Sequence, residues 1–319
     1  MTGYIIRRVG QSIVVILGVV LITFLLAKLI PGGEAKAVLG PKATPANIAH
    51  FNRLNGLDAP IYLQFWRYVE GLFAHLNLGY SDKYNQGDRQ VIGERLPKTL
   101  TLVGVSTLIA LVLAIPLGIL QVVRRNKPID YALTGASFFF YAMPDFLFGT
   151  LLIIWFSFDL GWFPVSPPTD SSAWAIFTDP RAFILPVVTL AATTVASFSR
   201  YMRSSMMDAL AEDYIRTARA KGASNRRVLY GNALRNALIP LLTLLGLSLP
   251  AIVSGALIVE NVFNYPGMGL LTVQSAFNDD IPVVLGTTLV ITVATVIGSL
   301  MADILYAVAD PRIRLGGGD

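Results

Sequence analysis

Six long apolar stretches dominate the hydrophobic pattern of the chain. They cover residues 9–30, 99–123, 132–158, 182–199, 238–259 and 283–308. Each has close to the ~20 mostly apolar residues that a helix needs to cross the hydrocarbon core of a bilayer. The pattern therefore predicts an all-α integral membrane protein with six transmembrane helices.

The first stretch has two interpretations. Arg7 and Arg8 precede it and residues 35–37 (AKA) resemble a cleavage site, as in a secretory signal peptide. Its apolar run is longer than the roughly 7–15 residues of a signal peptide. We therefore expect residues 1–30 to form an N-terminus and a retained first transmembrane helix.

The polar segment 31–98 is predicted to form a helical region on the outer surface. Thr44-Pro45 is typical of a helix start, Gly56 of its end, and Pro60 of a second start. The second helix would place Ile61, Phe65, Val69 and Leu72 on one side, with the aromatic residues Tyr62, Trp66 and Tyr68 near the lipid headgroups. This region either docks a cargo receptor or simply packs on the spans.

Two further loops are expected on the outer side. Residues 158–181 are rich in proline and tryptophan, and residues 261–282 contain a Pro-Gly turn at 266–267. Residues 270–277 are apolar enough to form a short re-entrant helix. Such a helix is stable at membrane depth only when buried in protein or lining a wet cavity.

Composition supports a membrane protein and excludes several functions. The chain is 54% hydrophobic and 14% charged, with a mean hydropathy of +0.60, whereas soluble proteins carry about 25% charged residues. It has no cysteine, no phosphate-binding G-x-x-x-x-G-K-[ST] loop, and two histidines, His50 and His75, outside any metal-ligand spacing. We therefore expect no catalytic residue, no metal site and no cofactor in this chain.

Basic residues predict the orientation. Most of the 25 lysines and arginines lie before the first span, at residues 124–127, between 200 and 236, and in the tail 309–319 with Arg312 and Arg314. Short loops rich in lysine and arginine stay in the cytoplasm. Both termini are therefore expected to be cytoplasmic. Because these basic residues flank apolar spans, we attribute the net charge of +5 to lipid headgroups, and expect no nucleic acid partner.

The inner loop 200–237 is much longer than a connection requires. Residues 208–220 predict a helix, Gly222 a left-handed position after its end, and Ser224 the N-cap of a second helix over 225–238. The two helices would lie at an angle, parallel to the membrane, with several arginines exposed. Spacing alone favours equally a soluble partner and anionic lipid.

Three acidic residues within or beside the spans have both functional and structural interpretations. Asp145, after Pro144, either faces a cargo pathway or holds helices together, and an ionisable group at that depth costs about 3 kcal/mol or more unless sheltered. For Asp303 we favour a structural role. Glu260 either fixes the loop of Pro266, Gly267 and Gly269 or contributes to an outer gate or receptor contact.

Residues 213–222 (DYIRTARAKG) resemble the coupling-loop signature of ABC importer permeases of the peptide/nickel branch. Arg216-Thr217-Ala218 stands where the general signature has Glu-Ala-Ala, which reverses the first charge, and Pro240 lies further from Gly222 than usual. Further similarities are Arg7-Arg8, residues 56–60 (GLDAP), Gln64, 78–81 (LGYS), 260–269 (ENVFNYPGMG), Asp303, Tyr306 and 310–314 (DPRIR). The long outer segment is similar to that of the dipeptide/oligopeptide "B" type.

The resemblance implies a type I importer architecture, with a permease core at 99–308. It implies a homologous second permease, two cytoplasmic ATPases that carry ATP and Mg²⁺, and an outer solute-binding protein, in the inner membrane of a prokaryote. The implied ATPase-coupling residues are Asp213, Arg216, Thr217, Ala218, Arg219, Gly222, Arg226 and Arg227. The implied cargo is a di- or oligopeptide.

Two other classes remain open from the sequence. A secondary transporter or channel would work without an ATPase and predicts inverted repeats, and no convincing repeat is visible. An intramembrane enzyme would need a Ser–His or Asp–Asp pair within the spans, and both histidines lie outside them.

Overall fold

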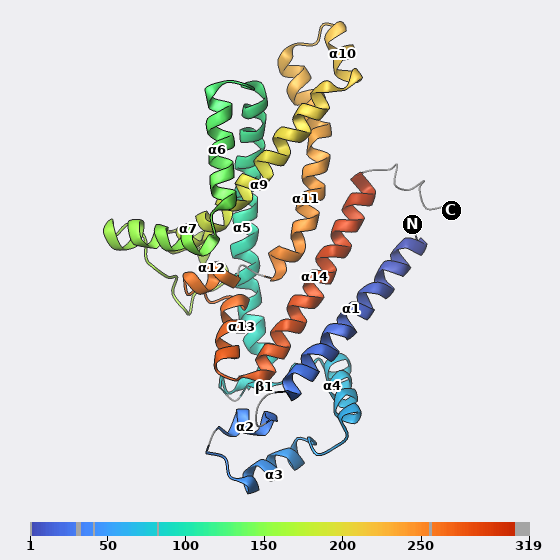
Figure 1. Ribbon diagram of the computed structural model, residues 1–319, viewed down its shortest axis with the longest axis vertical. Coiled ribbons are helices and arrows are strands. Elements are labelled where there is room, and N and C mark those ends of the chain that lie inside the picture. The colour runs from blue at the N-terminus through green and yellow to red at the C-terminus, as the bar shows by residue number, and fades with distance from the viewer. Residues whose placement is uncertain (1, 30–32, 41, 82, 255–256, 310–319) are drawn as a thin grey trace.

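A computed structural model describes residues 2–29, 33–40, 42–81, 83–254 and 257–309. The side chains of a few further residues, including 247–254 and 302–309, are outside the description. The chain forms an elongated helical bundle with a small cap at one end and a short helix, α10, at the other (Figure 1). Within the described residues, the strands are one antiparallel pair, β1 (Tyr80–Ser81) and β2 (Gln86–Gly87).

Five helices of the described chain are long and apolar enough to cross a membrane, and six if one bent pair counts as a single span. Four of the five lie within α1 (Thr2–Lys28), α5 (Asp88–Val123), α9 (Ile184–Ala211) and α14 (Ile281–Ala309). The other, Arg227–Gly246, combines the π-helix η3 (Arg227–Ala233) with the first part of α11 (Leu234–Ser254). The bent pair is α6 (Pro128–Ala142) and α7 (Asp145–Leu152), which continues as the π-helix η1 (Ile153–Asp159). The predicted all-α membrane fold is confirmed.

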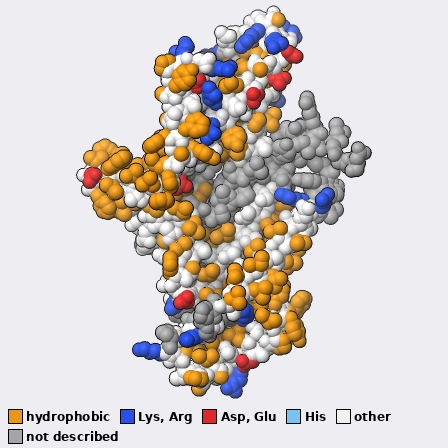
Figure 2. Space-filling view, viewed as in Figure 1, with side chains coloured by type: hydrophobic (Ala, Val, Ile, Leu, Met, Phe, Trp, Pro, Cys, Tyr) orange, Lys and Arg blue, Asp and Glu red, His pale blue; other side chains and the backbone are white. Residues whose placement is uncertain are grey.

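The third predicted span, 132–158, consists of two helices joined at a sharp bend. It breaks at residues 143–144, and the two parts differ in direction by 102°. Pro144 lacks an N–H and disfavours a helical conformation at Met143 before it. The second part projects sideways from the bundle as an apolar arm (Figures 1 and 2). Its exposed side chains include Phe146, Leu147, Ile154, Trp155, Phe158 and Leu160.

Other span boundaries also differ from the expectation. Helix α5 begins eleven residues before the predicted 99, and α9 continues to Ala211 instead of ending at 199. The fifth predicted span, 238–259, is covered by α11 and by the separate α12 (Leu257–Val262). The hydrophobic pattern marks the part of a helix that lies in the bilayer, whereas these helices continue into polar regions where the sequence is no longer apolar.

Each long helix packs along a neighbour. Helix α5 packs along α9 in the same direction, because Leu102 lies with Val187 and Ile119 lies with Met202. Helix α11 packs antiparallel to α14 (Figure 1). Helix α1 contacts mainly α14, and the two run in opposite directions, so the chain enters and leaves the bundle on the same side (Figure 1). Only 11% of the apolar window of α1 is buried, so most of this helix lies exposed on the side of the bundle.

The cap consists of α2 (Gly33–Leu39), α3 (Pro45–Leu54) and α4 (Ile61–His75). The predicted N-cap is confirmed, because Asn47 N donates a 3.3 Å hydrogen bond to Thr44 Oγ1. The apolar side of α4 packs on two spans through Leu72, which is buried with Val20 of α1 and Leu289 of α14. Helix α2 and the β1–β2 pair were not predicted.

The remaining elements are short. They are α8 (Ala175–Thr178), the 3₁₀ turn η2 (Pro180–Ala182) and α13 (Met268–Phe277). Helix α13 confirms that residues 270–277 are helical, and it packs between α12, α14 and α5. Residues 268–271 at its start are buried, whereas Gln274, Ala276 and Phe277 near its end are exposed.

Candidate functional site

The inner loop forms a compact helical hairpin at one end of the bundle. After a break at Glu212, the helix α10 (Asp213–Ala220) begins. Gly222 has φ +79°, its N–H donates to Arg219 O (2.9 Å), and Ala223 N donates to Ala218 O (3.1 Å). This pair of bonds is a Schellman ending, which favours glycine because a side chain is strained at positive φ. The predicted left-handed position at Gly222 is confirmed.

The second half of the hairpin differs from the expectation. Ser224 is the predicted N-cap, and its Oγ accepts a 3.4 Å hydrogen bond from Arg227 N. The helix that follows passes through the π-helix η3 (Arg227–Ala233) directly into α11. A separate second helix at an angle over 225–238 is therefore wrong, as is a single helix over 208–220, because α9 reaches Ala211 before the break.

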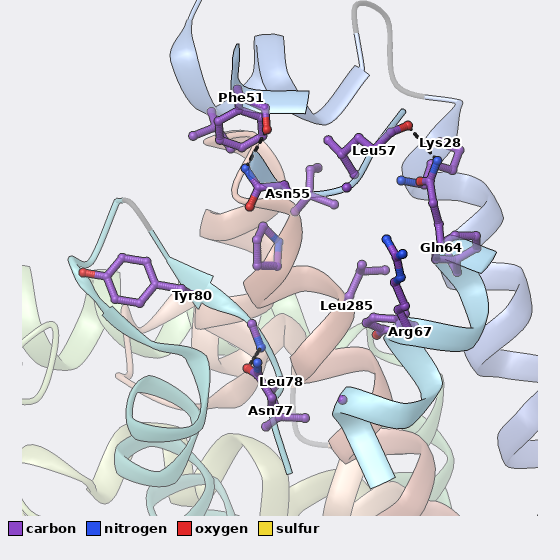
Figure 3. Close-up of a pocket in the computed structure, with 18 residues that line it drawn as sticks. Lys28, Phe51, Asn55, Leu57, Gln64, Arg67, Asn77, Leu78, Tyr80 and Leu285 are labelled. Carbon is purple, nitrogen blue, oxygen red and sulfur yellow. Dashed lines mark hydrogen bonds between the residues drawn. The ribbon is translucent and has the colours of Figure 1, made fainter. Parts of the chain in front are cut away.

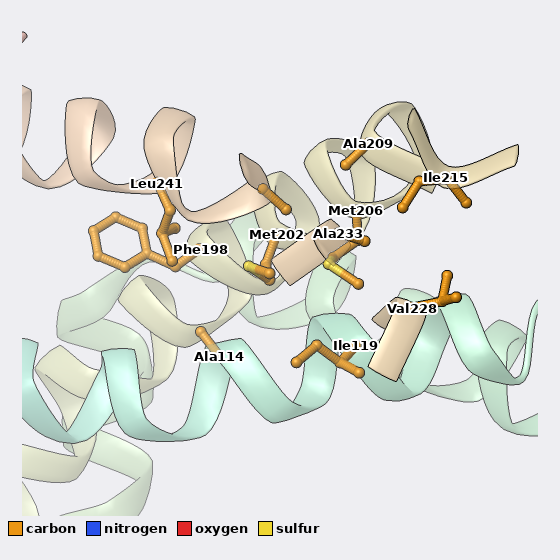
Figure 4. Packing of buried hydrophobic residues seen from close by; sticks show 11 residues of the cluster. Ala114, Ile119, Phe198, Met202, Met206, Ala209, Ile215, Val228, Ala233 and Leu241 are labelled. Carbon is orange, nitrogen blue, oxygen red and sulfur yellow. The ribbon is translucent and has the colours of Figure 1, made fainter. Parts of the chain in front are cut away.

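Two buried side chains join this hairpin to the spans. Ile215 of α10 is fully buried and Val228 of η3 is 2% exposed. Both belong to a hydrophobic cluster with Met202 and Met206 of α9 and Ile119 of α5 (Figure 4). The cluster also includes Leu241 of α11. A displacement of α10 therefore acts directly on α5, α9 and α11, because a close-packed interior transmits strain.

The outward side of the hairpin is polar and cationic. Ile215 is the buried residue of α10, while the Asp213 and Arg216 side chains are 91% and 78% exposed and joined by a 3.2 Å ion pair. Lysine and arginine side chains gather over this end of the molecule (Figure 2). The expected coupling residues Thr217, Arg219, Gly222, Arg226 and Arg227 are also exposed, and Ala218 is half-buried.

An ion pair near the hairpin end of the bundle was not predicted from the sequence. Arg203 of α9 donates two hydrogen bonds of 3.1 Å to the carboxylate of Asp130 of α6, which is 2% exposed. Asn126 N also donates to this carboxylate, at 3.0 Å. An acid in the first turn of a helix, directly after a basic loop, is the signal that could have indicated it. The pair joins α6 to α9, the helix that leads into this hairpin.

Asp145 lies at the break in the third span. It is the first residue of α7, directly after Pro144. Its Oδ1 is buried and has no hydrogen-bond partner among the described residues. One carboxylate oxygen is therefore unsatisfied within the described part of the chain, a condition that marks functional positions in membrane segments more often than structural ones.

Glu260 is the centre of a buried latch that we define as Glu260, Thr99 and residues 266–270. Its carboxylate accepts hydrogen bonds from Thr99 Oγ1 (2.6 Å), Gly269 N (2.6 Å) and Leu270 N (3.2 Å). Thr99 Oγ1 accepts in turn from Met268 N at 2.8 Å. The first N–H groups of α13, which have no partner within the helix, are thus satisfied by residues of α5 and α12.

The latch explains the spacing of the glycines in residues 260–269. A Cβ on Gly267 would lie 2.5 Å from the carboxylate of Glu260, and one on Gly269 would lie 2.6 Å from Leu257 Cα. Neither position has room for a side chain. Pro266 O accepts a 3.3 Å hydrogen bond from Arg95 of α5. Of the two interpretations of Glu260, the structure shows that it fixes this loop, and a gating or receptor role stays a prediction.

Some predicted positions give no structural information. The side chain of Asp303 in α14, and all of residues 310–314, lie outside the described residues. Within the described part of the chain, no group of three or more His, Cys, Asp or Glu residues is arranged to hold a metal ion.

Comparison with known proteins gives two family matches that together span the chain. Residues 107–315 match the family model described as "Binding-protein-dependent transport system inner membrane component". Residues 1–103 match the N-terminal model of the same kind of membrane component.

Curated relatives align along nearly the whole length. An oligopeptide transport system permease protein of Bacillus subtilis (strain 168) is 42% identical over 98% of this chain and 100% of its own length. A probable D,D-dipeptide transport system permease protein of Escherichia coli (strain K12) is 37% identical, with 98% of each chain covered. A glutathione transport system permease protein of Salmonella paratyphi A (strain ATCC 9150 / SARB42) is 36% identical over 98% of this chain and 99% of its own. The chain therefore belongs to the family of inner membrane components of binding-protein-dependent transport systems.

Proposed function

We propose that this chain is the membrane-spanning permease subunit of an ATP-driven importer of peptides. The family works with a solute-binding protein and with ATPase subunits, and the relatives include oligopeptide and dipeptide permeases. The observation that carries the proposal is the coupling hairpin. It presents a cationic face to a partner and transmits force through Ile215 and Val228 to three spans.

In this proposal, α10 binds a cytoplasmic ATPase and both termini are cytoplasmic. The cap of α2 to α4 then lies on the outer side, within reach of a solute-binding protein. Closure of the ATPases on ATP moves α10, and the cluster around Ile215 carries the motion to α5, α9 and α11. No residue of this chain takes part in ATP hydrolysis.

The apolar arm formed by α7 and η1 is proposed to bind the second permease subunit. It leaves the bundle at 102° to α6 and exposes large apolar side chains, among them Trp155 at 52% and Phe158 at 70%. Exposed aromatic surface of this extent is typical of an interface with protein or lipid. Asp145 at the root of this arm would then face the pathway shared by the two permeases.

Site-specific crosslinking tests the coupling proposal directly, because the chain has no cysteine. Arg219→Cys should crosslink to an ATPase subunit of the intact assembly, and the yield should change when ATP is bound. Asp170→Cys, on an exposed loop at the other side, is the matched control and should not crosslink. Equal crosslinking of both variants, or of neither, would exclude α10 as the ATPase contact.

Reconstitution separates this function from a secondary transporter. Liposomes containing this chain, a second permease and the ATPases should take up a labelled pentapeptide only with ATP and a solute-binding protein. Peptide uptake driven by an ion gradient, with the ATPases left out, would contradict the proposal.

A further inference from the structure

Two buried carboxyl groups lie where the outer hairpin meets two spans. Asp88, the first residue of α5, is fully buried, and Asp280, in the turn before α14, is 4% exposed. The Ser81 hydroxyl of β1 donates a hydrogen bond to Asp280 Oδ2. Asp88 N donates a 3.1 Å bond to Gly79 O. The β1–β2 hairpin with the start of α5, and the turn before α14, therefore converge on two acidic side chains.

The charge of Asp88 is not compensated by the surrounding protein. Neither of its carboxylate oxygens has a hydrogen-bond partner in the part of the chain that the structure describes. The charged group that acts on it is Asp280, which repels it. Burial of an unpaired charge is strongly unfavourable, and buried charges are normally paired or coordinate a metal ion.

The other polar groups near the pair supply oxygen atoms. The Ser275 hydroxyl is buried and has no partner among the described residues, and Ser275 O accepts from Asp280 N at 2.9 Å. Burial, and then the charge of Asp88, raise the pKa of Tyr68 to about 12, so the phenol near Asp88 stays neutral at physiological pH. Carboxylate and hydroxyl oxygens suit hard cations such as Ca²⁺ and Mg²⁺.

An open pocket lies next to this site, separated from it by Gly79. It has a volume of about 530 Å³ and lies between the cap, α1 and the start of α14 (Figure 3). Tyr68, Gly79 and Pro282 line it. A Cβ on Gly79 would lie 2.6 Å from Asp88 Oδ2 and 3.0 Å from Pro282 Cβ. The backbone of Gly79 therefore lies directly between the pocket and the carboxylate of Asp88.

We infer that Asp88 and Asp280 hold a hard divalent cation of the Ca²⁺ type, which ties the β1–β2 hairpin to α5 and α14. Two carboxylates neutralise the ion, and serine hydroxyls, backbone carbonyls and water complete its shell. A proton on Asp88 explains the site less well, because a protonated carboxyl would need an acceptor and Asp88 has none among the described residues. That the site faces outward rests on the proposed function, whereas binding of the ion does not.

Thermal unfolding of the intact assembly tests the inference. After treatment with EGTA, in buffer with K⁺ as the cation, the unfolding midpoint should rise with added CaCl₂. The apparent Kd should lie on the order of 10⁻⁴ to 10⁻³ M, as in extracellular Ca²⁺ modules. Asp88→Asn and Asp280→Asn should each weaken this response at least tenfold. The control Asp170→Asn removes an exposed outer acid and should keep the full response.

A second measurement keeps the test valid if a variant fails to fold. Tb³⁺, a luminescent substitute for Ca²⁺, should bind the wild-type assembly with emission excited through tyrosine, and CaCl₂ should displace it. Absence of both Tb³⁺ binding and a midpoint shift with Ca²⁺ or Mg²⁺ overturns the inference, as does an Asp88→Asn variant with the wild-type response. Because these readouts do not use peptide uptake, the inference and the proposed function fail independently.

Discussion

The latch around Glu260 and the hairpin that contains α10 differ in how many of their polar groups find partners within the chain. The latch around Glu260 is closed, because its carboxylate accepts three hydrogen bonds from within the chain and Glu260, Phe263 and Met268 are fully buried. The coupling hairpin is open. Its helix α10 buries one side chain, Ile215, and leaves its charged groups exposed.

This difference indicates where the molecule is complete and where it needs a partner. A latch with all of its donors satisfied gains nothing from further contacts and holds α13 as part of a rigid body with α5 and α12. A hairpin that is anchored through few side chains can move relative to the spans at a low cost in free energy. Its charged face is available to another protein. Substitutions in the latch should therefore lower the stability of the assembly, whereas substitutions in the hairpin should mainly lower ATP-driven uptake.

The largest effect is expected for Glu260→Ala. It leaves three buried donors without an acceptor, each costing about 1–3 kcal/mol, so the assembly should lose about 4 kcal/mol of unfolding free energy. The thermal midpoint in detergent and the yield of inserted protein measure this. The control Glu94→Ala, at an exposed position of the same α5 that carries Thr99, should be neutral. Equal stability of the two variants would show that the latch is not closed.

Ile215→Ala should act mainly on coupling. It removes the fully buried anchor of α10 and should cost about 3 kcal/mol locally. Because α10 then moves without the spans, ATP hydrolysis should persist while ATP-driven uptake falls at least tenfold. The conservative Ile215→Val should lose about 1 kcal/mol and keep most uptake. A parallel loss of hydrolysis and uptake would instead indicate a general folding defect.

Gly222→Val should also uncouple hydrolysis from uptake, to a smaller extent. A Cβ here would meet nothing within 4 Å, so the penalty is purely conformational, from φ +79°. That penalty is roughly 1–2 kcal/mol. Gly231→Ala, in η3 and without positive φ, is the matched control and should be silent. Normal peptide uptake by Gly222→Val would remove the end of α10 from the mechanism.

The smallest effect on stability is expected for the exposed ion pair of α10. A double-mutant cycle with Asp213→Asn and Arg216→Gln should give a coupling energy below about 0.5 kcal/mol, because solvent screens exposed pairs. The same variants should weaken copurification of the ATPase subunits if these charges face a partner. A stability loss as large as that of Ile215→Ala would mean that α10 is more closed than its exposure indicates.

One more substitution tests the proposed cargo pathway, at the bend between α6 and α7. Asp145→Asn removes the charge of the half-buried carboxyl at the root of the arm without changing its size. If Asp145 faces the pathway, the KM for peptide should rise several-fold with the thermal midpoint unchanged. A lower midpoint with an unchanged KM would assign it to helix packing.

Local rules predicted much of the coupling hairpin and less of the latch. The glycine at 222 and the caps at Thr44 and Ser224 follow from neighbours within a few residues, and the structure confirms them. The Glu260–Thr99 bond joins residues that are 161 positions apart. For Glu260 the sequence left a choice between latch and gate, and Asp130 with Arg203 was not predicted at all.

By itself, the sequence determined the membrane-spanning helical class, because the free energy of apolar burial depends on runs of residues that are adjacent in the chain. It also determined where α10 ends, because positive φ at one residue is a local property. Pro144 marks the break in the third span, but only the tertiary structure decided that its two parts differ in direction by 102° and that η3 continues into α11. The tertiary structure also brought Asp88 to Asp280 and Glu260 to Thr99. Those outcomes depend on which helices meet, and contacts between distant segments leave no periodic signal in a single chain.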